Sequence, residues 1–348
     1  GIDIFSSNLQ TAMNEQGPII EKEIFNLSNA AFESLALKIF LFQYNENDTY
    51  RLFCNSIHRD PSTVKKIEEI PFLPIQFFKS RKICSTSFLP EVFFESSGTT
   101  GSVNSRHFVK SVDIYKKSFC KTFQLFYNDI KNWCIIGLLP SYQQKGNSSL
   151  VYMVNKLIIQ SESKESGFYL SDYEKLSKTI LQNEADEKPT LLIGVTYALL
   201  EFAEKYPLSL KHTTVMETGG MKGRREEMTR EEVHTKLKTQ FGINVIHSEY
   251  GMTELLSQAY SAGNGIFNCP PWMKILIRSE DDPFNVISSH AVSGNLVAGA
   301  INIIDLANLY SCAFIATDDI GKLYADDSFE VMGRMDNSDI RGCGLMIL

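Results

Sequence analysis

The sequence is poor in the features that mark membrane, secreted and nucleic-acid-binding proteins. Its 348 residues contain no apolar run as long as a membrane span, and the chain start lacks the basic, apolar and small-residue order of a signal peptide. Lys and Arg pairs are scattered and followed by acidic residues, and the formal net charge is −7. Because proteins that bind duplex DNA usually cluster positive charge, we expect no nucleic-acid partner and no membrane span.

Cysteine and histidine are not arranged in the patterns that bind metals. The seven cysteines form no C-x-x-C pair, and the six histidines are dispersed along the chain. A zinc site is therefore not expected. Free thiols, odd in number, in a large acidic chain favour a reducing environment, so we expect a cytoplasmic protein.

What the sequence does contain is a globular composition with alternating helix and strand patterns. Hydrophobic residues make up 43% of the chain and charged residues 22%, and no repeat or low-complexity linker is present. Predicted helices cover 30–44, 112–130, 172–182, 197–205 and 231–241; predicted strands cover 91–95, 133–139, 190–194 and 244–247, with short β-rich stretches from 274 onward. This order predicts an α/β fold with layered subdomains and a β-rich portion.

A loop of small polar residues follows the strand predicted at 91–95. It consists of Ser96, Ser97, Gly98, Thr99, Thr100 and Gly101. The glycines let backbone N–H groups converge on an anion, and the hydroxyls add donors, so the loop has the design of a phosphate cradle. No Gly-Lys-Ser/Thr closes it, so it is not the Walker sequence. On its own the loop fits a surface hairpin turn about as well.

A second motif, Glu-Tyr-Gly-Met-Thr-Glu at 249–254, comes directly after the strand predicted at 244–247. Tyr250 offers a face on which adenine can stack, Thr253 a hydroxyl for phosphate, and Glu254 a hard oxygen ligand for Mg²⁺. The alternative is a strand-to-helix junction in which Thr253 caps a helix and Glu254 favours its N-terminal dipole. Alone, the motif favours that alternative.

A third motif is the double glycine of Thr218, Gly219 and Gly220, which a Lys- and Arg-containing stretch follows at 221–225. Paired glycines let the backbone approach a flat ring closely, and the cations suit phosphates. The alternative is a tight turn with a solvated run of charges, which is the better interpretation of this motif in isolation.

The fourth motif combines Thr317, Asp318 and Asp319 with Arg334, fifteen residues after Asp319. An Asp can accept hydrogen bonds from both ribose hydroxyls, and a nearby Arg can pair with a phosphate. The alternative is a common hairpin signal, since Asp-Asp-x-Gly is frequent in tight turns.

Taken together and in order, these motifs resemble the motif series of the acyl-adenylate-forming superfamily, which includes acyl-CoA ligases, peptide-synthetase adenylation domains and firefly-type luciferases. The series reads S-S-G-T-T-G, L-L-P-S-Y, G-V-T-Y, T-G-G, E-Y-G-M-T-E, T-D-D-I-G and G-R-M-D, from about residue 95 to the end. The resemblance implies that superfamily's large-domain architecture. Residues 91–333 would form the adenylate-forming core, and 1–90 a helical part of the same catalytic unit.

The resemblance also implies ATP and Mg²⁺ as cofactors and a role for each motif. Residues 96–101 would hold the β- and γ-phosphates, with Arg106 in place of the family's usual lysine. The remaining implied roles are ATP binding by Gly219, Gly220, Tyr250, Gly251 and Asp319, catalysis by Thr253 and Arg334, Mg²⁺ binding by Glu254, and an acyl pocket bordered by Tyr142, Gly194 and Tyr197. The family's Thr-Gly-Asp reads Thr-Asp-Asp here, so either Asp318 or Asp319 could bind ribose. Tyr142 fits the core as well as the pocket.

The chain ends fourteen residues after Arg334, whereas typical members of the superfamily continue into a mobile C-terminal lid domain, so we expect that lid to be absent. The short tail, 334–348, instead contains Cys343 between two glycines. A thiolate attacks acyl-adenylates readily because AMP is a good leaving group, and flanking glycines would let the tail reach the site. The alternative for Cys343 is a small buried hydrophobe.

A short adenylating chain with such a cysteine resembles one narrower family, the acyl-protein synthetases of bacterial luminescence, or long-chain-fatty-acid–luciferin-component ligases. The resemblance implies an AMP-forming ligase that activates a carboxylic acid, in that family a fatty acid, and transfers the acyl group to its own Cys343. Delivery to an acyl reductase-like partner or an acyl carrier would follow. The alternatives are a CoA ligase of the phenylacetate type and a catalytically inactive acyl-binding homologue.

Overall fold

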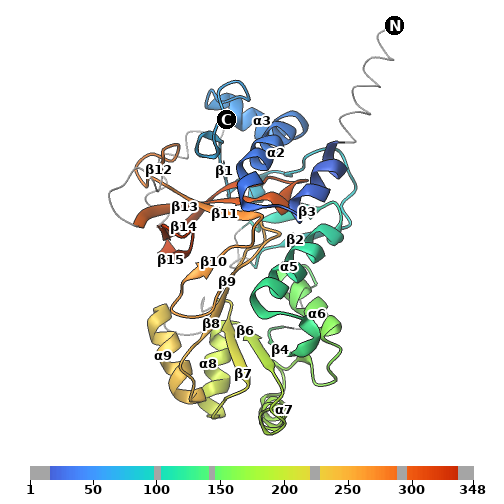
Figure 1. Cartoon of the computed structure of the whole chain (residues 1–348), viewed down its shortest axis with the longest axis vertical. Helices are drawn as coiled ribbons and strands as arrows, with labels where there is room; N and C mark the ends of the chain where they lie inside the picture. The colour runs from blue at the N-terminus through green and yellow to red at the C-terminus, as the bar shows by residue number, and fades with distance from the viewer. Residues whose placement is uncertain (1–15, 98–102, 141–145, 220–227, 288–295, 336–348) are drawn as a thin grey trace.

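One mixed sheet runs through the molecule, and segments far apart in the sequence contribute to it (Figure 1). The computed structural model describes residues 16–97, 103–140, 146–219, 228–287 and 296–335. Within these residues the sheet has thirteen strands in the order β12-β11-β13-β14-β15-β10-β9-β8-β7-β6-β4-β5, and β1 pairs with β14. The strands are β1 (Leu73–Pro74), β4 (Cys134–Leu138), β5 (Gly167–Phe168), β6 (Thr190–Gly194), β7 (Thr213–Glu217), β8 (His247–Tyr250), β9 (Ala259–Ser261), β10 (Phe267–Asn268), β11 (Met273–Arg278), β12 (Val286–Ile287), β13 (Leu296–Asp305), β14 (Phe314–Tyr324) and β15 (Phe329–Arg334).

Helices cover both faces of the parallel half of the sheet, and a separate hairpin lies beside it. The hairpin consists of β2 (Val92–Glu95) and β3 (Arg106–Val109). The helices are α2 (Phe32–Glu46), α3 (Asp48–Ser56), α4 (Phe77–Ser80), α5 (Val112–Tyr127), α6 (Ser149–Ser161), α7 (Tyr173–Ala185), α8 (Thr196–Lys205) and α9 (Arg230–Phe241), preceded by helical residues 16–24.

The apolar strands β4 and β6 are buried on both faces, as expected for the centre of a parallel sheet. Successive side chains of a strand point to opposite faces, so β4 and β6 contribute side chains to two hydrophobic cores, one on each face of the sheet. Ile135 and Ile193 pack on the side of α5 and α6, whereas Ile136 and Leu192 pack on the side of α7, α8 and α9. In Figure 1, α8 and α9 accordingly lie across the sheet from α5 and α6.

The direction of the sheet changes after β8. Strands β4, β6, β7 and β8 are parallel, whereas β8 pairs with β9 in the antiparallel sense. Strands β9 to β15 continue as an antiparallel sheet whose longest ladder joins β13 and β14. The carboxyl ends of the parallel strands therefore lie close to the junction with the antiparallel part.

Local sequence explains where several helices begin and end. Ser111 and Ser148 cap α5 and α6 by accepting hydrogen bonds from backbone N–H groups of the first turn. Helix α9 begins with a capping box between Thr229 and Glu232, and it ends at Gly242, whose φ of 61° few other residues adopt easily.

The predicted elements are confirmed within three residues at their ends, and the strand predicted at 244–247 is the one displaced by three residues at both ends. The strand β8 begins at His247, so Glu249 and Tyr250 lie inside it rather than after it. No helix follows in the described chain around Thr253, because residues 251–258 form turns that lead into β9. Pairing with the end of β7, where Met216 faces His247, sets the position of β8, and the sequence alone does not reveal that partner.

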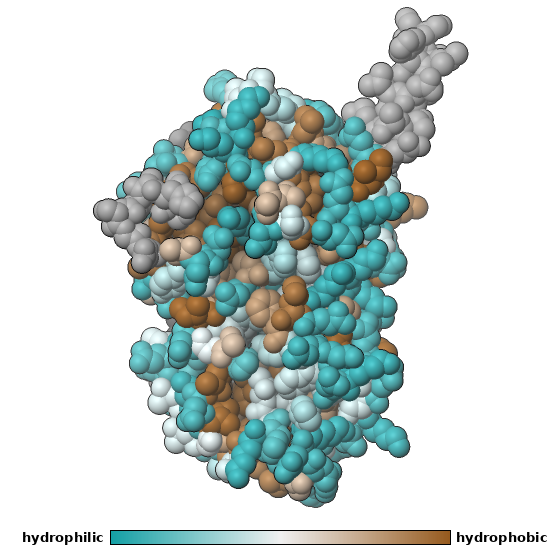
Figure 2. Space-filling view, in the orientation of Figure 1, coloured by the Kyte–Doolittle hydropathy of each residue, from teal (hydrophilic) through white to brown (hydrophobic). Residues whose placement is uncertain are grey.

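The surface in the view of Figure 2 is mostly hydrophilic, and its hydrophobic side chains form separate groups. Exposed large hydrophobic residues come from many different elements, which is ordinary for a folded protein. Within the described residues, no helix is both long and apolar enough to cross a membrane.

Candidate functional site

The motifs identified in the sequence meet at the carboxyl ends of the parallel strands. Gly194 ends β6, Glu217 ends β7 and Tyr250 ends β8, so the segments that follow these strands leave the sheet at one edge. In open α/β sheets this edge is where ligands usually bind. The antiparallel strand β14 brings Asp319 to the same place.

Tyr250, Asp319 and Arg334 form a connected polar group. The Tyr250 hydroxyl donates to Asp319 Oδ2 at 2.7 Å, and Arg334 Nε lies 3.4 Å from Asp319 Oδ1. Asp319 and Arg334 are direct partners in the ladder between β14 and β15. Burial raises the pKa of Asp319, and the Tyr250 hydroxyl and the Arg334 charge only partly oppose that rise. The structure thus joins residues 69 positions apart into one site.

The two adjacent aspartates have different surroundings. Asp319 is 7% exposed and faces Tyr250, whereas Asp318 Oδ1 accepts a hydrogen bond of 2.6 Å from Gln76 Nε2. Gln76 directly precedes α4, so the N-terminal part of the chain holds Asp318 in place. Of the two candidates, Asp319 is the one that lies with Tyr250 and Arg334.

Glu254 lies beside the base of the predicted phosphate loop. It is 6% exposed, and the side chain of Ser105 lies beside it. The Ser105 N–H in turn donates to Ser96 Oγ at 2.9 Å, and the Ser96 N–H donates to the Ser105 carbonyl. Burial raises the pKa of Glu254, while Ser105 and the charges of Lys79 and Arg334 lower it. Glu254, the last residue of the tyrosine motif, therefore lies close both to Ser105 at the base of the loop and to the positive charges of Lys79 and Arg334.

Arg106 lies at the start of β3 and pairs with an acidic side chain of β2. It is the cross-strand partner of Glu95 in the β2–β3 hairpin, with Arg106 Nε 3.4 Å from Glu95 Oε1. The pair is largely exposed on the arginine side, so it contributes little to stability. A phosphate would have to compete with Glu95 for this guanidinium.

The glycine turn is organised by Glu217, a residue outside the motifs that the sequence singled out. Its carboxylate accepts hydrogen bonds from the Gly219 N–H at 2.7 Å and the Thr196 hydroxyl at 3.2 Å. It also accepts from Ser248 Oγ at 2.8 Å and lies 3.5 Å from His234 Nε2. Burial alone would raise the pKa of Glu217, but the bonds from His234, Ser248 and Gly219 hold it below the usual value.

The Glu217 carboxylate bonds residues of two predicted motifs, the one that begins at Gly194 and the one that begins at Thr218. Backbone bonds also run from the Thr196 N–H to the Gly219 carbonyl and from the Thr218 N–H to the Gly194 carbonyl. Gly219 has a φ of 76°, a conformation that a side chain disfavours. The signal in the sequence was a lone acidic residue directly before Thr-Gly-Gly, at the end of an apolar strand.

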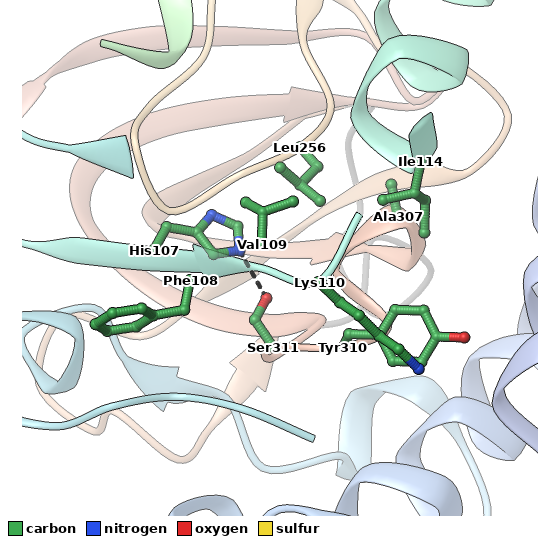
Figure 3. Close-up of a pocket in the computed structure, with 9 residues that line it drawn as sticks. All are labelled: His107, Phe108, Val109, Lys110, Ile114, Leu256, Ala307, Tyr310 and Ser311. Carbon is green, nitrogen blue, oxygen red and sulfur yellow. Dashed lines mark hydrogen bonds between the residues drawn. The ribbon is translucent and has the colours of Figure 1, made fainter. Parts of the chain in front are cut away.

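His107 lies in β3 and links the β2–β3 hairpin to the tyrosine motif by a hydrogen bond. Its Nδ1 donates to the Thr253 carbonyl at 2.9 Å, and its Nε2 accepts from Ser311 Oγ at 2.8 Å. Figure 3 shows the second bond at the wall of a small pocket, where Lys110 lies over the ring of Tyr310. Burial lowers the pKa of His107 to about 4, so the imidazole is neutral near pH 7. With both ring nitrogens bonded, His107 has the contacts of a structural histidine.

A buried turn between β13 and β14 holds the segment after the tyrosine motif, and no motif in the sequence marks this turn. Asp305 accepts hydrogen bonds from the backbone N–H groups of Leu256 and Ser257 and from the Ser257 hydroxyl. Asn308 Nδ2 donates to the Glu254 carbonyl at 2.7 Å. Both side chains are fully buried, so these bonds fix the backbone on which Glu254 is placed.

The other predicted site residues divide into two groups. Tyr197 is partly buried in the first turn of α8, and Gly194 is buried at the end of β6, next to the glycine turn. Seven predicted residues lie outside the described part of the chain: Gly98, Thr99, Thr100, Gly101, Tyr142, Gly220 and Cys343.

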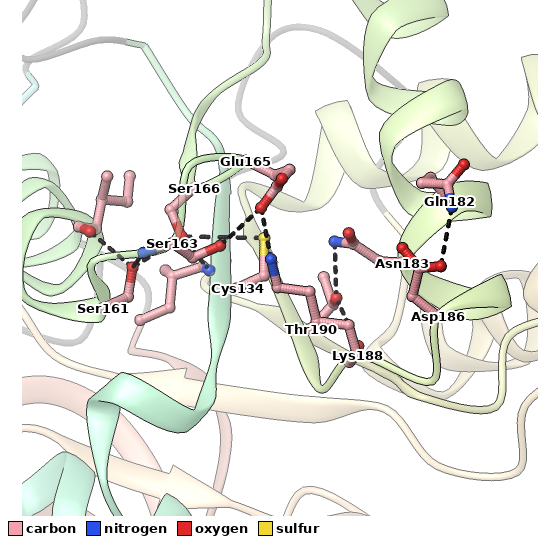
Figure 4. Close-up of polar contacts among 12 residues, drawn as sticks. Cys134, Ser161, Ser163, Glu165, Ser166, Gln182, Asn183, Asp186, Lys188 and Thr190 are labelled. Carbon is pink, nitrogen blue, oxygen red and sulfur yellow. Dashed lines mark hydrogen bonds and ion pairs between the residues drawn. The ribbon is translucent and has the colours of Figure 1, made fainter.

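The opposite edge of the sheet has a polar cluster of a different kind (Figure 4). Glu165 pairs with Lys188, Asn183 donates to Thr190, and the side chains of Ser161 and Ser166 bond each other. The hydrogen bond from Lys188 holds the pKa of Glu165 at about 2. At this edge, near the starts of β4 and β6, the polar side chains therefore bond one another.

The acidic residues of the site fit Mg²⁺ only in combination with a phosphate ligand. Within the described chain, no three His, Cys, Asp or Glu side chains are grouped to hold a metal ion. Mg²⁺ is commonly bound by one or two carboxylates together with substrate phosphates. Glu254, a buried carboxylate at the base of the loop, suits that arrangement.

Comparisons with known proteins show the family of the chain. A family model described as "Acyl-protein synthetase, LuxE" matches residues 6–348. A long-chain-fatty-acid–luciferin-component ligase from Aliivibrio fischeri is 24% identical over 339 residues, covering 90% of this chain and 86% of the relative.

Solved structures show a similar fold. The luciferase-like enzyme of the nonluminescent mealworm Zophobas morio matches with a TM-score of 0.50 and 15% identity, covering 80% of this chain and 61% of its own. ATP-bound MatB from Rhodopseudomonas palustris matches with a TM-score of 0.51 and 13% identity, covering 70% and 47%. The chain thus spans about half to three fifths of these enzymes, and its fold is that of acyl-adenylate-forming enzymes.

Proposed function

The chain belongs to the acyl-protein synthetase family, and from that premise we propose that it activates a carboxylic acid with ATP and then carries the acyl group as a thioester on Cys343. Family and relative make the chain a ligase. The observation that carries the proposal is the polar group formed by the buried Tyr250 and Asp319 with the exposed Arg334, next to the buried Glu254. Three separate sequence motifs supply these side chains, and they meet at one edge of the sheet.

The proposal gives each of these residues a role toward the nucleotide. Asp319 would accept the ribose hydroxyls, Tyr250 would lie against the adenine, and Arg334 would face the ribose or the phosphates. The Glu217-ordered turn at Gly219 would let the backbone approach the adenine closely. Residues 96–101 and Thr253 would donate to the phosphates. Mg²⁺ held at Glu254 would neutralise phosphate charge.

In the first proposed step, an oxygen of the substrate carboxylate attacks the α-phosphorus of ATP. A bond forms between that oxygen and phosphorus, the bond between the α-phosphorus and the bridging oxygen breaks, and pyrophosphate leaves. The carboxylate is already ionised near neutral pH, so the step needs no general base. What the protein supplies is orientation and donors aimed at the developing phosphate charge.

In the second proposed step, the Cys343 sulfur attacks the acyl carbon of the acyl-adenylate. The thioester bond forms, AMP leaves with the electron pair of the broken carbon–oxygen bond, and the thiol proton is released to solvent. A reductase-like protein or an acyl carrier would then take the acyl group. A fatty acid is the favoured substrate, because the relative from Aliivibrio fischeri is a long-chain-fatty-acid ligase.

Substitution of the cysteine separates the two steps. We expect Cys343→Ser to retain acid-dependent exchange of pyrophosphate into ATP while losing hydroxylamine-labile labelling of the protein by radioactive acid. Cys84→Ser, at a partly buried thiol in the N-terminal part, should retain both. An undiminished acyl-protein in Cys343→Ser would contradict the acceptor assignment. Formation of acyl-CoA on addition of CoA, with no acyl-protein in the wild type, would favour the CoA ligase alternative.

A further inference from the structure

The first side chain of the tyrosine motif, Glu249, has no role in the proposed nucleotide site. Glu249 lies in β8 between Ser248 and Tyr250, whose hydroxyls bond Glu217 and Asp319. Because side chains alternate along a strand, Glu249 points to the opposite face of the sheet. Its direct cross-strand partner is Tyr260 of β9, which contacts Phe126 and Tyr127 of α5. Glu249 therefore faces α5, away from Asp319.

Two polar side chains meet next to Gly251. A Cβ added at Gly251 would overlap Glu249 Oε1 and would lie 3.3 Å from Gln258 Cγ. The carboxyl group of Glu249 therefore points along β8 toward Gly251. Gly251 lies directly after the end of β8, on the edge of the sheet where the site is. Gly251 is the residue that leaves room for the carboxyl group.

Neither of these side chains has a hydrogen-bond partner in the described part of the chain. Gln258 is 3% exposed, and its Oε1 is buried without a donor among the described residues. Glu249 keeps some accessible surface, yet it too has no hydrogen bond there. Most buried polar groups in proteins are bonded, and an unsatisfied one costs about 1–3 kcal/mol. Gln258 Oε1 is such a group, and together with the partly exposed Glu249 carboxyl beside it, it points to a ligand that bonds both.

The chemistry of the pair selects the kind of ligand group. Burial, together with the negative charge of Glu217, raises the pKa of Glu249 to about 8. Near pH 7 the carboxyl is therefore mostly protonated and can donate, whereas Gln258 Oε1 can only accept. A hydroxyl both accepts and donates, so it satisfies the two groups together. The surroundings are otherwise aromatic: Tyr260 lies opposite Glu249, and the nearby Tyr115 hydroxyl already donates to the Ser149 carbonyl.

We propose that Glu249 and Gln258 form a polar subsite for the acyl chain of the acid substrate, which takes a hydroxyl or a similar neutral hydrogen-bonding group. The inference rests on the proposed function, which uses the face of β8 with Tyr250 and Asp319 for the nucleotide. The opposite face remains for the acid, whose carboxylate must reach the same edge. The favoured fatty acid is then one whose chain carries a hydroxyl or a comparable polar substituent.

Matched acids test this subsite. Each unsubstituted fatty acid in a chain-length series is compared with its β-hydroxy and ω-hydroxy derivatives, and kcat/KM is measured by pyrophosphate exchange. We expect the wild type to prefer one hydroxylated acid over its plain counterpart by about tenfold or more. Glu249→Leu and Gln258→Leu should each bring that ratio to within about twofold. Glu249→Gln, which keeps hydrogen-bonding atoms, and the surface control Gln182→Leu should preserve it.

Equal kcat/KM for both members of every pair in the wild type would overturn the subsite. So would a hydroxyl preference that persists in both leucine variants.

If no acid supports exchange, the proposed function fails, and binding still decides the subsite. The increase in Tm on adding each acid reports binding without turnover. A larger increase with the hydroxylated acid, lost in Glu249→Leu, supports the subsite; equal increases contradict it. Should Glu249→Leu fail to fold, Gln258→Leu decides by the same measurements.

Discussion

At the scale of single residues, Asp318 and Asp319 differ in what their side chains contact. Asp319 shares its carboxylate with Tyr250 and Arg334, whereas Asp318 bonds Gln76 on the side of α4. The sequence left both candidates open because they are neighbours in the chain. Their separation depends on the alternation of side chains along β14, which places them on opposite faces.

This difference predicts unequal effects of two matched substitutions. Asp319→Asn should lower kcat/KM for acid-dependent pyrophosphate exchange by about 100-fold or more, because a charged acceptor for the ribose is lost. Asp318→Asn should lower it by less than about fivefold, since an amide can still bond Gln76. Steady-state exchange with ATP as the varied substrate measures both, and equal losses would contradict the assignment.

His107 predicts a pH dependence of stability. Burial holds its folded pKa at about 4, below the value of about 6.5 in the unfolded chain, so the unfolded state binds the extra proton first. Its contribution to stability is therefore complete above about pH 6.5 and is lost as the pH falls toward 4. Between pH 7 and pH 5 the loss amounts to about 2 kcal/mol.

Comparison with His107→Gln isolates this contribution from the other titrating groups. Denaturant unfolding of both proteins at the two pH values gives the free energies. The wild type should lose about 2 kcal/mol more than His107→Gln on acidification. The same pH dependence in both proteins would show that His107 is not buried as a neutral imidazole.

At the scale of elements, the turn between β13 and β14 determines the position of the tyrosine motif. Asn308→Ala removes the donors to the Glu254 and Cys312 carbonyls and the acceptor of the Leu256 N–H. We expect the free energy of unfolding to fall by about 2–4 kcal/mol, with reduced exchange activity from the misplaced Glu254. Denaturant unfolding and exchange assays measure the two effects.

Asn285→Ala is the matched control, because Asn285 is exposed near β12 and its side chain makes no hydrogen bond within the described residues. It should change both quantities by little. If Asn308→Ala behaves like this control, the turn does not support the site.

Elements with strong local patterns could be predicted from the sequence. The buried strand β6 was placed correctly because its apolar run, Thr190 to Gly194, is bounded by clear helical patterns. The strand β8 was misplaced because the residues before His247 are as compatible with a strand as those that form it. Its position follows from pairing with β7 and β9, which are contacts between distant segments.

At the scale of the whole molecule, the sequence predicted the fold class and the motifs of the site, but not the residues that hold the motifs together. Glu217, Asp305 and Asn308 act through partners up to 54 residues away, so no local pattern marks them. The part of the chain before residue 91 also contributes more than expected. Strand β1 joins β14, and Gln76 and Phe78 contact Asp318 and His107.

The central claim is that this chain forms an acyl-adenylate at the edge that carries Tyr250, Asp319 and Glu254. Incorporation of labelled pyrophosphate into ATP, measured over a panel of carboxylic acids, tests it most directly. The account predicts exchange that requires an acid and Mg²⁺ and that falls by about 100-fold in Asp319→Asn. Absence of exchange with every acid, or exchange undiminished in both Asp319→Asn and Glu254→Gln, would contradict it.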